Sequence, residues 1–308
     1  MAKAVHYLYN KETRWIGGER LVNQTILVSD LDGTLLNKDQ QISQQNMAAI
    51  RIFRELGGIF TLATGRMEAA VAPFIKELNL DVPVILYNGA RIYNPITHEV
   101  LYDRHLPLTQ ELWQQIMNRL TADIGLFVYR NGQVYTPNRN QLVVEHEEKD
   151  KVTCSLLTEM TVMDNITKLL LISSDLNKLK AIEQLVQDHG VPHEIVYSEW
   201  NYLEILPPDV SKGNALQALL QILSIQNAYT MAVGDNLNDI SLMRSADRGY
   251  AVANAHPDLK KAADDVTIHH EQHAIAAIIK DYFIEQGVTL DEPFGDSASD
   301  GENCRRND

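Results

Sequence analysis

Two aspartates separated by a single residue follow a short apolar run near the start of the chain, in the segment Asp30-Leu31-Asp32-Gly33-Thr34. The run before them, Thr25–Ser29, has the character of a buried strand in a parallel sheet. Because side chains alternate across a strand, Asp30 and Asp32 are expected to leave it on the same side. Gly33 permits a sharp turn directly afterwards. Ligands of parallel sheets bind outside the carboxyl ends of the strands, so this segment is a candidate site for carboxylate chemistry.

Paired aspartates in a short loop can also belong to a calcium site or to a simple turn. An EF-hand calcium loop needs oxygen ligands at its first, third and fifth positions and glycine at its sixth. Counted from Asp30, the fifth residue is Thr34 and the sixth is Leu35, which excludes a calcium loop of this kind. A self-capping Asx turn remains compatible with the segment alone. The rest of the chain has to decide between that turn and a catalytic site.

Composition limits the classes of partner. The chain has 308 residues, a formal net charge of −14 and 45% hydrophobic residues, which predicts one large or two modest domains with a substantial core. The negative charge argues against nucleic-acid and anionic-membrane partners, and no window approaches the ~20 apolar residues of a membrane span. Cys154 and Cys304 fit no disulfide framework or zinc spacing. A soluble, cytoplasmic protein is expected.

Strands and helices alternate at both ends of the chain. Ser43 is expected to cap a helix that ends near Gly57-Gly58. Further buried strands are expected at 59–63, 84–87 and 229–233, with helices between them. This alternation predicts an α/β fold with a doubly wound parallel sheet.

The middle of the chain has a different texture, typical of a mixed α+β insert. Asn131-Gly132 lies between two β-rich arms and predicts a hairpin over 125–135. A strand at 168–172, a helix over 176–189 closed by Gly190, and a strand at 194–197 follow. The predicted division is an N-terminal extension (1–23), a two-piece core (24–90 and 207–288), an inserted α+β cap that acts as a lid (91–206) and a disordered acidic tail (289–308).

Polar side chains follow four of the predicted strands. Taken singly, each has an ordinary structural role, because Thr64 and Asp235 can cap helices and Lys212 can be a surface lysine. Taken together, they suit a phosphate site. Mg²⁺ prefers carboxylates from distant segments combined with waters and substrate phosphate, and a lysine and a hydroxyl can grip the remaining phosphoryl oxygens. The positions concerned are Asp30, Asp32, Thr64, Lys212 and the segment Gly234-Asp235-Asn236-Leu237-Asn238-Asp239.

In their order along the chain, these segments resemble the four motifs of the haloacid dehalogenase-like (HAD) hydrolases. Asp30 to Thr34 is similar to the first motif, Thr64-Gly65-Arg66 to the second, Lys212 to the third, and Gly234-Asp235 through Asn238-Asp239 to the fourth. An insert between the second and third motifs, with Asn88-Gly89-Ala90 and the segment 203–216, is similar to the Cof-type phosphatases. The resemblance covers about 25–286 and implies a HAD-like, Rossmannoid core with an inserted cap.

The resemblance also implies an activity and a set of roles. The activity is Mg²⁺-dependent hydrolysis of a small phosphomonoester, such as a sugar phosphate or a cofactor- or nucleotide-like phosphate. Asp30 would be the nucleophile that becomes an aspartyl phosphate, and Asp32 the general acid and base. The other implied roles are metal binding by Asp30, Asp32 and Asp235, phosphate binding by Thr64, Gly65, Lys212 and Asn238, and support of Lys212 or of a metal-bound water by Asp239.

The insert would exclude water and contact the leaving group, as closing domains commonly do. Its candidate specificity residues are Tyr129, Arg130, Tyr135 and Trp200, although aromatic residues of a cap can equally form its core.

Several alternatives remain open. A phosphomutase on the same scaffold, or a phosphosugar-binding regulatory protein, would use a similar site. A receiver domain also phosphorylates an aspartate, but it is typically shorter and lacks a large insert. His269, His270 and His273 do not form H-E-x-x-H, and they are expected at a solvated helix start and not around zinc.

Overall fold

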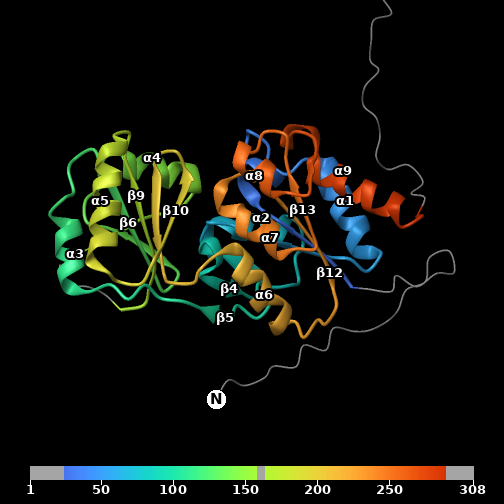
Figure 1. Ribbon diagram of the computed structural model, residues 1–308, viewed down its shortest axis with the longest axis horizontal. Coiled ribbons are helices and arrows are strands. Elements are labelled where there is room, and N and C mark those ends of the chain that lie inside the picture. The colour runs from blue at the N-terminus through green and yellow to red at the C-terminus, as the bar shows by residue number, and fades with distance from the viewer. Residues whose placement is uncertain (1–23, 158–163, 289–308) are drawn as a thin grey trace, which may run out of the picture.

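The computed structural model describes residues 24–157 and 164–288, so the expectations for the extension 1–23 and the acidic tail 289–308 lie outside the described residues. The described chain forms two lobes (Figure 1). The core lobe is built on a five-stranded sheet, and the cap lobe, residues 110–157 and 164–206, carries a separate six-stranded sheet. Among the described residues, no helix combines the length and apolar character needed to cross a membrane.

The core sheet is entirely parallel, with the strand order β14-β13-β12-β1-β2. Its central strand β1 pairs with β12 on one side and β2 on the other, so that Ser29 lies opposite Val233 and Leu62. Every residue of β1 is buried, which accounts for its uninterrupted apolar sequence. The strands are β1 (Thr25–Ser29), β2 (Ile59–Leu62), β12 (Tyr229–Gly234), β13 (Arg248–Ala251) and β14 (Asp265–Val266).

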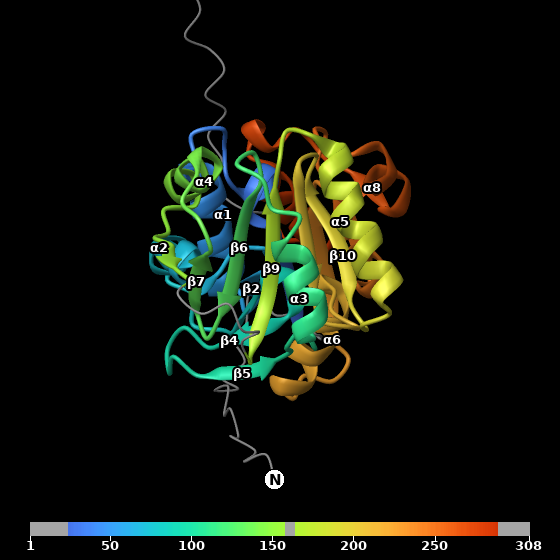
Figure 2. The same cartoon turned by 90° about the vertical axis from the view of Figure 1, so that its left-hand side faces the viewer.

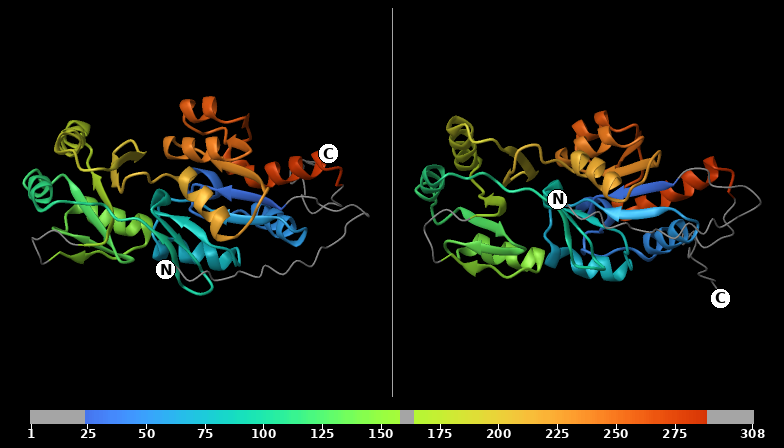
Figure 3. Two further views of the ribbon diagram at one scale, coloured as in Figure 1. Left: turned by 60° about the horizontal axis from the view of Figure 1, so that its bottom comes forward. Right: turned by 90° about the horizontal axis from the view of Figure 1, so that it is seen from below.

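Helices cover both faces of this sheet. In the sheet, β2 lies on the side of β1 that faces away from β12, whereas β13 lies on the side of β12 that faces away from β1. The connections β1 to β2 and β12 to β13 therefore run in opposite directions across the sheet. Because parallel crossovers are right-handed, the connecting helices lie on opposite faces, as Figure 3 shows. The predicted doubly wound sheet is confirmed, as is the N-cap of the first helix, where the Ser43 hydroxyl accepts a hydrogen bond from the Asn46 N–H (3.2 Å). The helices are α1 (Gln44–Glu55), α2 (Glu68–Glu77), α6 (Lys212–Ile222), α7 (Ile240–Ser245), α8 (Pro257–Ala262) and α9 (Ala274–Glu285).

A small antiparallel sheet links the core to the cap. Strand β3 (Val84–Leu86) pairs with β4 (Arg91–Tyr93), which pairs with β5 (Val100–Asp103). A parallel bridge between Ala63 and Ile85 joins this sheet to the edge of the core sheet at β2. The chain therefore stays with the core sheet through β5 before it enters the cap.

The cap is an α+β lobe with strand order β10-β11-β9-β6-β7-β8. The predicted hairpin is confirmed, because β6 and β7 are joined by Asn131 and Gly132, both with positive φ (51° and 72°). The predicted closure of α5 by Gly190 is also confirmed. Helices α3 and α5 cover the outer face of the sheet (Figures 1 and 2). The elements are α3 (Gln110–Met117), β6 (Gly125–Arg130), β7 (Gln133–Thr136), α4 (Gln141–Asp150), β8 (Ser155–Leu156), β9 (Ile166–Ile172), α5 (Leu176–His189), β10 (Glu194–Glu199) and β11 (Tyr202–Leu206).

Candidate active site

The carboxyl ends of β1 and β12 bring two distant aspartates together. Asp30 directly follows β1 and Asp235 directly follows β12. The Asp30 N–H donates to the Val233 carbonyl across the two strands (2.9 Å). The crossovers leave β1 and β12 in opposite directions, which makes this pair the switch point where doubly wound sheets bind ligands.

Gly33 allows the turn after β1 to lie against Asp235. The wide turn η1 (Leu31–Leu35) contains Gly33 at φ +69°, a conformation that side chains with a Cβ rarely adopt. A Cβ at this position would lie 2.5 Å from Asp235 Oδ2. The Gly33 carbonyl accepts a hydrogen bond from Asn254 Nδ2 (2.8 Å). Both the backbone conformation and the space beside Asp235 therefore require glycine.

Lys212 is buried between two carboxylates and is not a surface lysine. It is the first residue of α6, and its Nζ donates to Asp30 Oδ1 and to Asp239 Oδ1, both at 2.6 Å. Its side chain is 0% exposed. Burial alone would lower the pKa of Lys212, but the carboxylates of Asp239 and Asp30 raise it above its usual value. The ammonium is therefore permanently charged and holds Asp30 in place.

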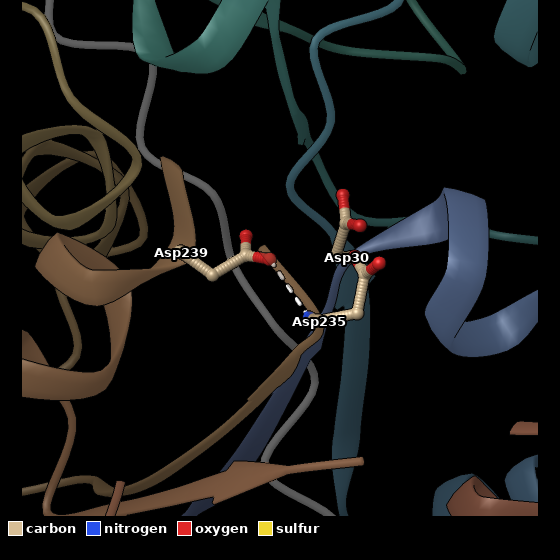
Figure 4. Close-up of side chains that lie close together, drawn as sticks. All are labelled: Asp30, Asp235 and Asp239. Carbon is tan, nitrogen blue, oxygen red and sulfur yellow. Dashed lines mark hydrogen bonds between the residues drawn. The ribbon is translucent and has the colours of Figure 1, made fainter. Parts of the chain in front are cut away.

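Asp239 is fully engaged by the protein. One of its oxygens accepts from Lys212, and the other accepts from the backbone N–H groups of Asp235 (3.0 Å) and Asn236 (3.1 Å). Figure 4 shows the first of these backbone bonds and the Asp239 carboxylate turned toward the other two aspartates. Asp239 thus orients both Lys212 and the backbone that carries Asp235.

The donor set suits a hard divalent cation. Oxygens of Asp30, Asp235 and Asp239 all lie within 4.8 Å of one another, and Lys212 supplies one positive charge against three carboxylates. Burial raises the pKa of Asp30 to about 7, against the opposing effect of Lys212. Burial, with the neighbouring Asp30 and Asp239, raises the pKa of Asp235 to about 9. Since Asp239 is already engaged, Asp30 and Asp235 are the carboxylates with oxygens to offer a metal such as Mg²⁺.

Arg66 fixes the orientation of Asp32. Its guanidinium donates from Nε to Asp32 Oδ2 (2.8 Å) and from Nη2 to Asp32 Oδ1 (2.6 Å), a bidentate pair with defined geometry. The guanidinium also lies 5.5 Å from the centre of the Phe74 ring. Arg66 stands directly after Thr64 and Gly65 in the segment that resembles the second motif, but reasoning from sequence gave it no role.

A chain of amide groups connects Asn238 to the cap. Asn88, at φ +56°, donates from Nδ2 to Glu204 Oε2 (2.7 Å) and accepts at Oδ1 from Asn238 Nδ2 (3.0 Å). An ionised carboxylate only accepts hydrogen bonds, so Glu204 fixes which way the Asn88 amide faces, and Asn88 fixes Asn238. The Asn88 N–H also donates to the carbonyl of the buried Thr64 (2.9 Å).

A buried ion pair from the cap supports the same region. Lys168 Nζ lies 3.1 Å from Glu204 Oε2, and both side chains are 4% exposed. Lys168 also donates to the Gly65 carbonyl (2.9 Å), and Glu204 accepts from the Ser198 hydroxyl (2.7 Å). Sequence reasoning missed both roles, although Glu204 stands in the segment that resembles Cof-type proteins.

A cleft of about 270 Å³ lies between the lobes over these residues. This volume is below the ~300–1,000 Å³ of pockets for drug-sized ligands, so it suits a small metabolite. The core contributes Asp30, Asp32, Gly33, Gln40, Thr64, Gly65, Arg66, Asp235, Asn236 and Asn238, and the cap contributes His146, Lys149, Asp150, Lys168, Leu170, Ser198, Glu199, Tyr202 and Glu204.

The four candidate specificity residues are not among those that line this cleft. Tyr129 is buried in the cap, with its hydroxyl 3.0 Å from His146 Nε2. Arg130 donates to the Asp164 carbonyl (2.8 Å), Tyr135 donates to Gln133 (2.6 Å), and Trp200 is 66% exposed. The hairpin is predictable from sequence, but the face that it turns toward the core depends on how the two lobes pack.

The three histidines lie where the sequence predicts a helix start. His269 and His273 flank a short turn, and His273 directly precedes α9. His270 Nδ1 is hydrogen-bonded to the Leu36 carbonyl (2.7 Å). Within 24–157 and 164–288 they form no metal-binding cluster.

The chain is similar in sequence to proteins of one known family. Residues 27–279 match the family model of the haloacid dehalogenase-like hydrolases. The chain is 30% identical over 269 residues to the putative phosphatase YxeH of Bacillus subtilis, covering 82% of this chain and 96% of that protein. It is also 30% identical to the 5-amino-6-(5-phospho-D-ribitylamino)uracil phosphatase YwtE of the same species, covering 83% and 96%.

A solved structure shares the architecture. The crystal structure of a haloacid dehalogenase-like hydrolase from Bacteroides thetaiotaomicron superposes with a TM-score of 0.74 at 27% identity, covering 85% of this chain and all of that one. The predicted HAD-like core with an inserted cap is therefore confirmed.

The raised pKa of Asp235 leads to a prediction about stability. The folded protein favours the protonated carboxyl, whereas the unfolded chain ionises near pH 4. The free energy of unfolding of the metal-free protein should therefore fall as pH rises from about 4 toward 9. Asp235→Asn removes the contribution of this carboxyl, so we expect the free energy of unfolding of the variant to fall less between pH 5 and pH 9 than that of the parent.

Urea unfolding in EDTA at pH 5, 7 and 9 measures this difference. Asp39→Asn, which changes an exposed carboxylate outside the cluster, is the matched control and should follow the parent at all three pH values. Identical pH profiles for Asp235→Asn and the parent would show that the clustered charges cost the folded state nothing.

Proposed function

The chain belongs to the haloacid dehalogenase-like hydrolases and is a hydrolase of phosphoric monoesters, and from that premise we propose that it transfers the phosphoryl group of a small ester first to Asp30 and then to water, with the help of Mg²⁺. The resemblance to Cof-type phosphatases is confirmed by the family match and the relatives. The observation that carries the proposal is the carboxylate of Asp30, fixed by the buried Lys212 beside Asp235, at the floor of the cleft.

In the first step, Asp30 attacks phosphorus. An oxygen of its carboxylate forms the new bond to phosphorus as the ester bond to the leaving oxygen breaks. Lys212 lowers the repulsion between the carboxylate and the anionic phosphate, because its ammonium lies 2.6 Å from Asp30. Holding the nucleophile in one geometry also lowers the entropic part of the barrier.

Asp32 handles the proton in both steps. It protonates the leaving oxygen in the first step and removes a proton from the attacking water in the second, which releases phosphate and restores Asp30. Its side chain is 44% exposed and faces the cleft, so water and substrate can reach it. The bidentate pair with Arg66 gives Asp32 one defined orientation beside the cleft.

The remaining residues bind the phosphoryl group and the metal. We assign phosphoryl binding to Thr64, the backbone at Gly65, Lys212 and Asn238, and metal binding to Asp30, Asp235 and the main-chain carbonyl of Asp32. Bound Mg²⁺ would neutralise the excess negative charge of the aspartate cluster and polarise the phosphoryl oxygens. Asp239 supports Lys212 and does not need to touch the substrate.

The size of the cleft and the names of the relatives support a proposed substrate class. A cleft of about 270 Å³ suits a phosphorylated small molecule, and one relative is named for a ribityl-containing phosphate ester. We propose a sugar phosphate or a cofactor- or nucleotide-like phosphate for this chain.

The first prediction of this mechanism concerns Asp30 and the metal. Asp30→Asn should lower turnover by at least about a thousandfold, because the amide is a poor nucleophile, and EDTA should abolish turnover of the parent until Mg²⁺ is restored. Phosphate release from a panel of monoesters measures both effects, with Asp39→Asn as the active control. Undiminished release by Asp30→Asn in EDTA would refute the proposal, and phosphoryl transfer between sugars without phosphate release would indicate a phosphomutase.

The second prediction separates acid catalysis from binding. Asp32→Asn should lower the rate of hydrolysis of alkyl phosphate esters by about a hundredfold or more, because their leaving oxygen needs a proton. It should slow the phosphorylation step of 4-nitrophenyl phosphate much less, because nitrophenolate leaves without protonation. Single-turnover rates of nitrophenolate release and of sugar phosphate cleavage give the comparison. Equal losses for the two esters would mean that Asp32 does not protonate the leaving group.

A further inference from the structure

The cap wall of the cleft contains one carboxylate, Asp150, that has no lysine or arginine within ion-pair distance among the described residues, and we propose that it accepts a hydrogen bond from the leaving group of the substrate. It would select esters whose leaving group presents a hydroxyl or ammonium donor over esters whose leaving group is anionic. This inference rests on the proposed phosphatase function and adds to it the chemistry of the leaving group.

The other charged side chains that line the cleft outside the aspartate cluster are paired with one another. Arg66 holds Asp32, and Lys168 lies 3.1 Å from Glu204. Lys149 forms an ion pair with Glu199 and lies 4.7 Å from the centre of the Tyr202 ring. Among the charged residues that the cap contributes to the cleft, Asp150 is therefore the one without an ion pair to a lysine or arginine in the described parts of the chain.

Asp150 has no comparable partner within the described parts of the chain. Its closest basic group is His146 Nε2, at 3.6 Å from Oδ2, which is longer than a hydrogen bond. Burial, together with the nearby Lys168 and Lys149, lowers the pKa of His146 to about 3, so the imidazole is neutral at physiological pH. The same nitrogen already lies 3.0 Å from the Tyr129 hydroxyl. His146 therefore cannot neutralise Asp150.

His146 adds a second unsatisfied polar group at this end of the cleft. Its side chain is 2% exposed and lines the cleft. Its Nδ1 is buried and has no hydrogen-bond partner among the residues that the structure describes. Buried polar groups without partners are rare in folded proteins and often mark a place where a ligand binds. A polar ligand seated beside Asp150 would supply this carboxylate with a donor at a polar end of the cleft.

The position of Asp150 is unfavourable for the stability of the fold. It is the last residue of α4, where the helix dipole disfavours negative charge. Its side chain is only 19% exposed, and burial raises its pKa, although the more distant Arg66, Lys149 and Lys168 oppose this rise. The helix dipole and the burial both disfavour a negative charge at this position. Residues that are unfavourable for stability in this way are typical of functional sites.

The chemistry of this carboxylate sets the preference. The phosphoryl group binds at the core end of the cleft, so the far end of the leaving group faces the cap. There Asp150 can accept from a hydroxyl or from an ammonium group, and the latter gains a charge-assisted hydrogen bond. A second anionic group at the same place would meet this carboxylate, while the nearby Arg66, Lys149 and Lys168 are already paired with other carboxylates, and the repulsion would penalise binding.

Three esters on one six-carbon skeleton test the inference: glucose 6-phosphate, glucosamine 6-phosphate and 6-phosphogluconate, with 4-nitrophenyl phosphate as an ester without a donor. We expect kcat/KM of the parent to favour the first two over 6-phosphogluconate by roughly tenfold or more. Asp150→Asn should remove most of this preference, and 4-nitrophenyl phosphate reports any loss of rate that is common to all esters. A larger loss for glucosamine 6-phosphate than for glucose 6-phosphate would identify ammonium as the preferred donor.

Glu199→Gln is the matched control, because it removes the same charge from the same wall but from a carboxylate that is paired with Lys149. It should keep the preference of the parent, and thermal unfolding should show that both variants are folded. The inference is overturned if Asp150→Asn keeps the preference, or if both variants lose it equally, which would indicate a diffuse field. Hydrolysis of 4-nitrophenyl phosphate without any preference would overturn this inference alone, whereas no hydrolysis of any ester with Mg²⁺ would overturn the proposed function as well.

Discussion

The arrangement of the site depends on one buried ammonium group held between two carboxylates. Lys212 has 0% side-chain exposure and contacts Asp30 and Asp239 at 2.6 Å each. A buried ion pair contributes little net stability, but the loss of one partner leaves an unpaired buried charge at a cost of about 3–5 kcal/mol. This triad therefore forces β1, α6 and the turn after β12 into one geometry. Gly234 at the end of β12 belongs to the same constraint, because a Cβ at this position would lie 2.4 Å from Asp239 Cγ.

The second organising feature is the polar contact between cap and core. Glu204 and Lys168 belong to cap strands, yet they hold Asn88 and the Gly65 carbonyl of the core. Through Asn88 the contact reaches Asn238. The position of the cap and the orientation of the proposed phosphate-binding amide are thus physically linked. The cap therefore supplies both a wall of the cleft and contacts that orient core residues of the site.

Much of this could be predicted from sequence, for reasons that differ between residues. Turn and cap chemistry is local, so Ser43, Asn131-Gly132 and Gly190 were predictable from the residues beside them. Asp30 and Asp235 were predictable because they end apolar strands, and parallel strands end at one edge of a sheet. Other features could not be predicted from sequence. They are the partners of Arg66 and Glu204, the lack of a close cation at Asp150, and the positions of Tyr129 and Trp200. Each of these depends on how the two lobes pack, which no local pattern encodes.

The central claim is that Asp30 carries the phosphoryl group during turnover. Acid quenching during steady-state turnover, borohydride reduction and peptide mass spectrometry measure it most directly, because reduction converts an aspartyl phosphate to homoserine. The account predicts homoserine at position 30 only when both ester and Mg²⁺ are present, and none in Asp30→Asn. Continued phosphate release with an unmodified Asp30, or homoserine at another aspartate, would contradict the account.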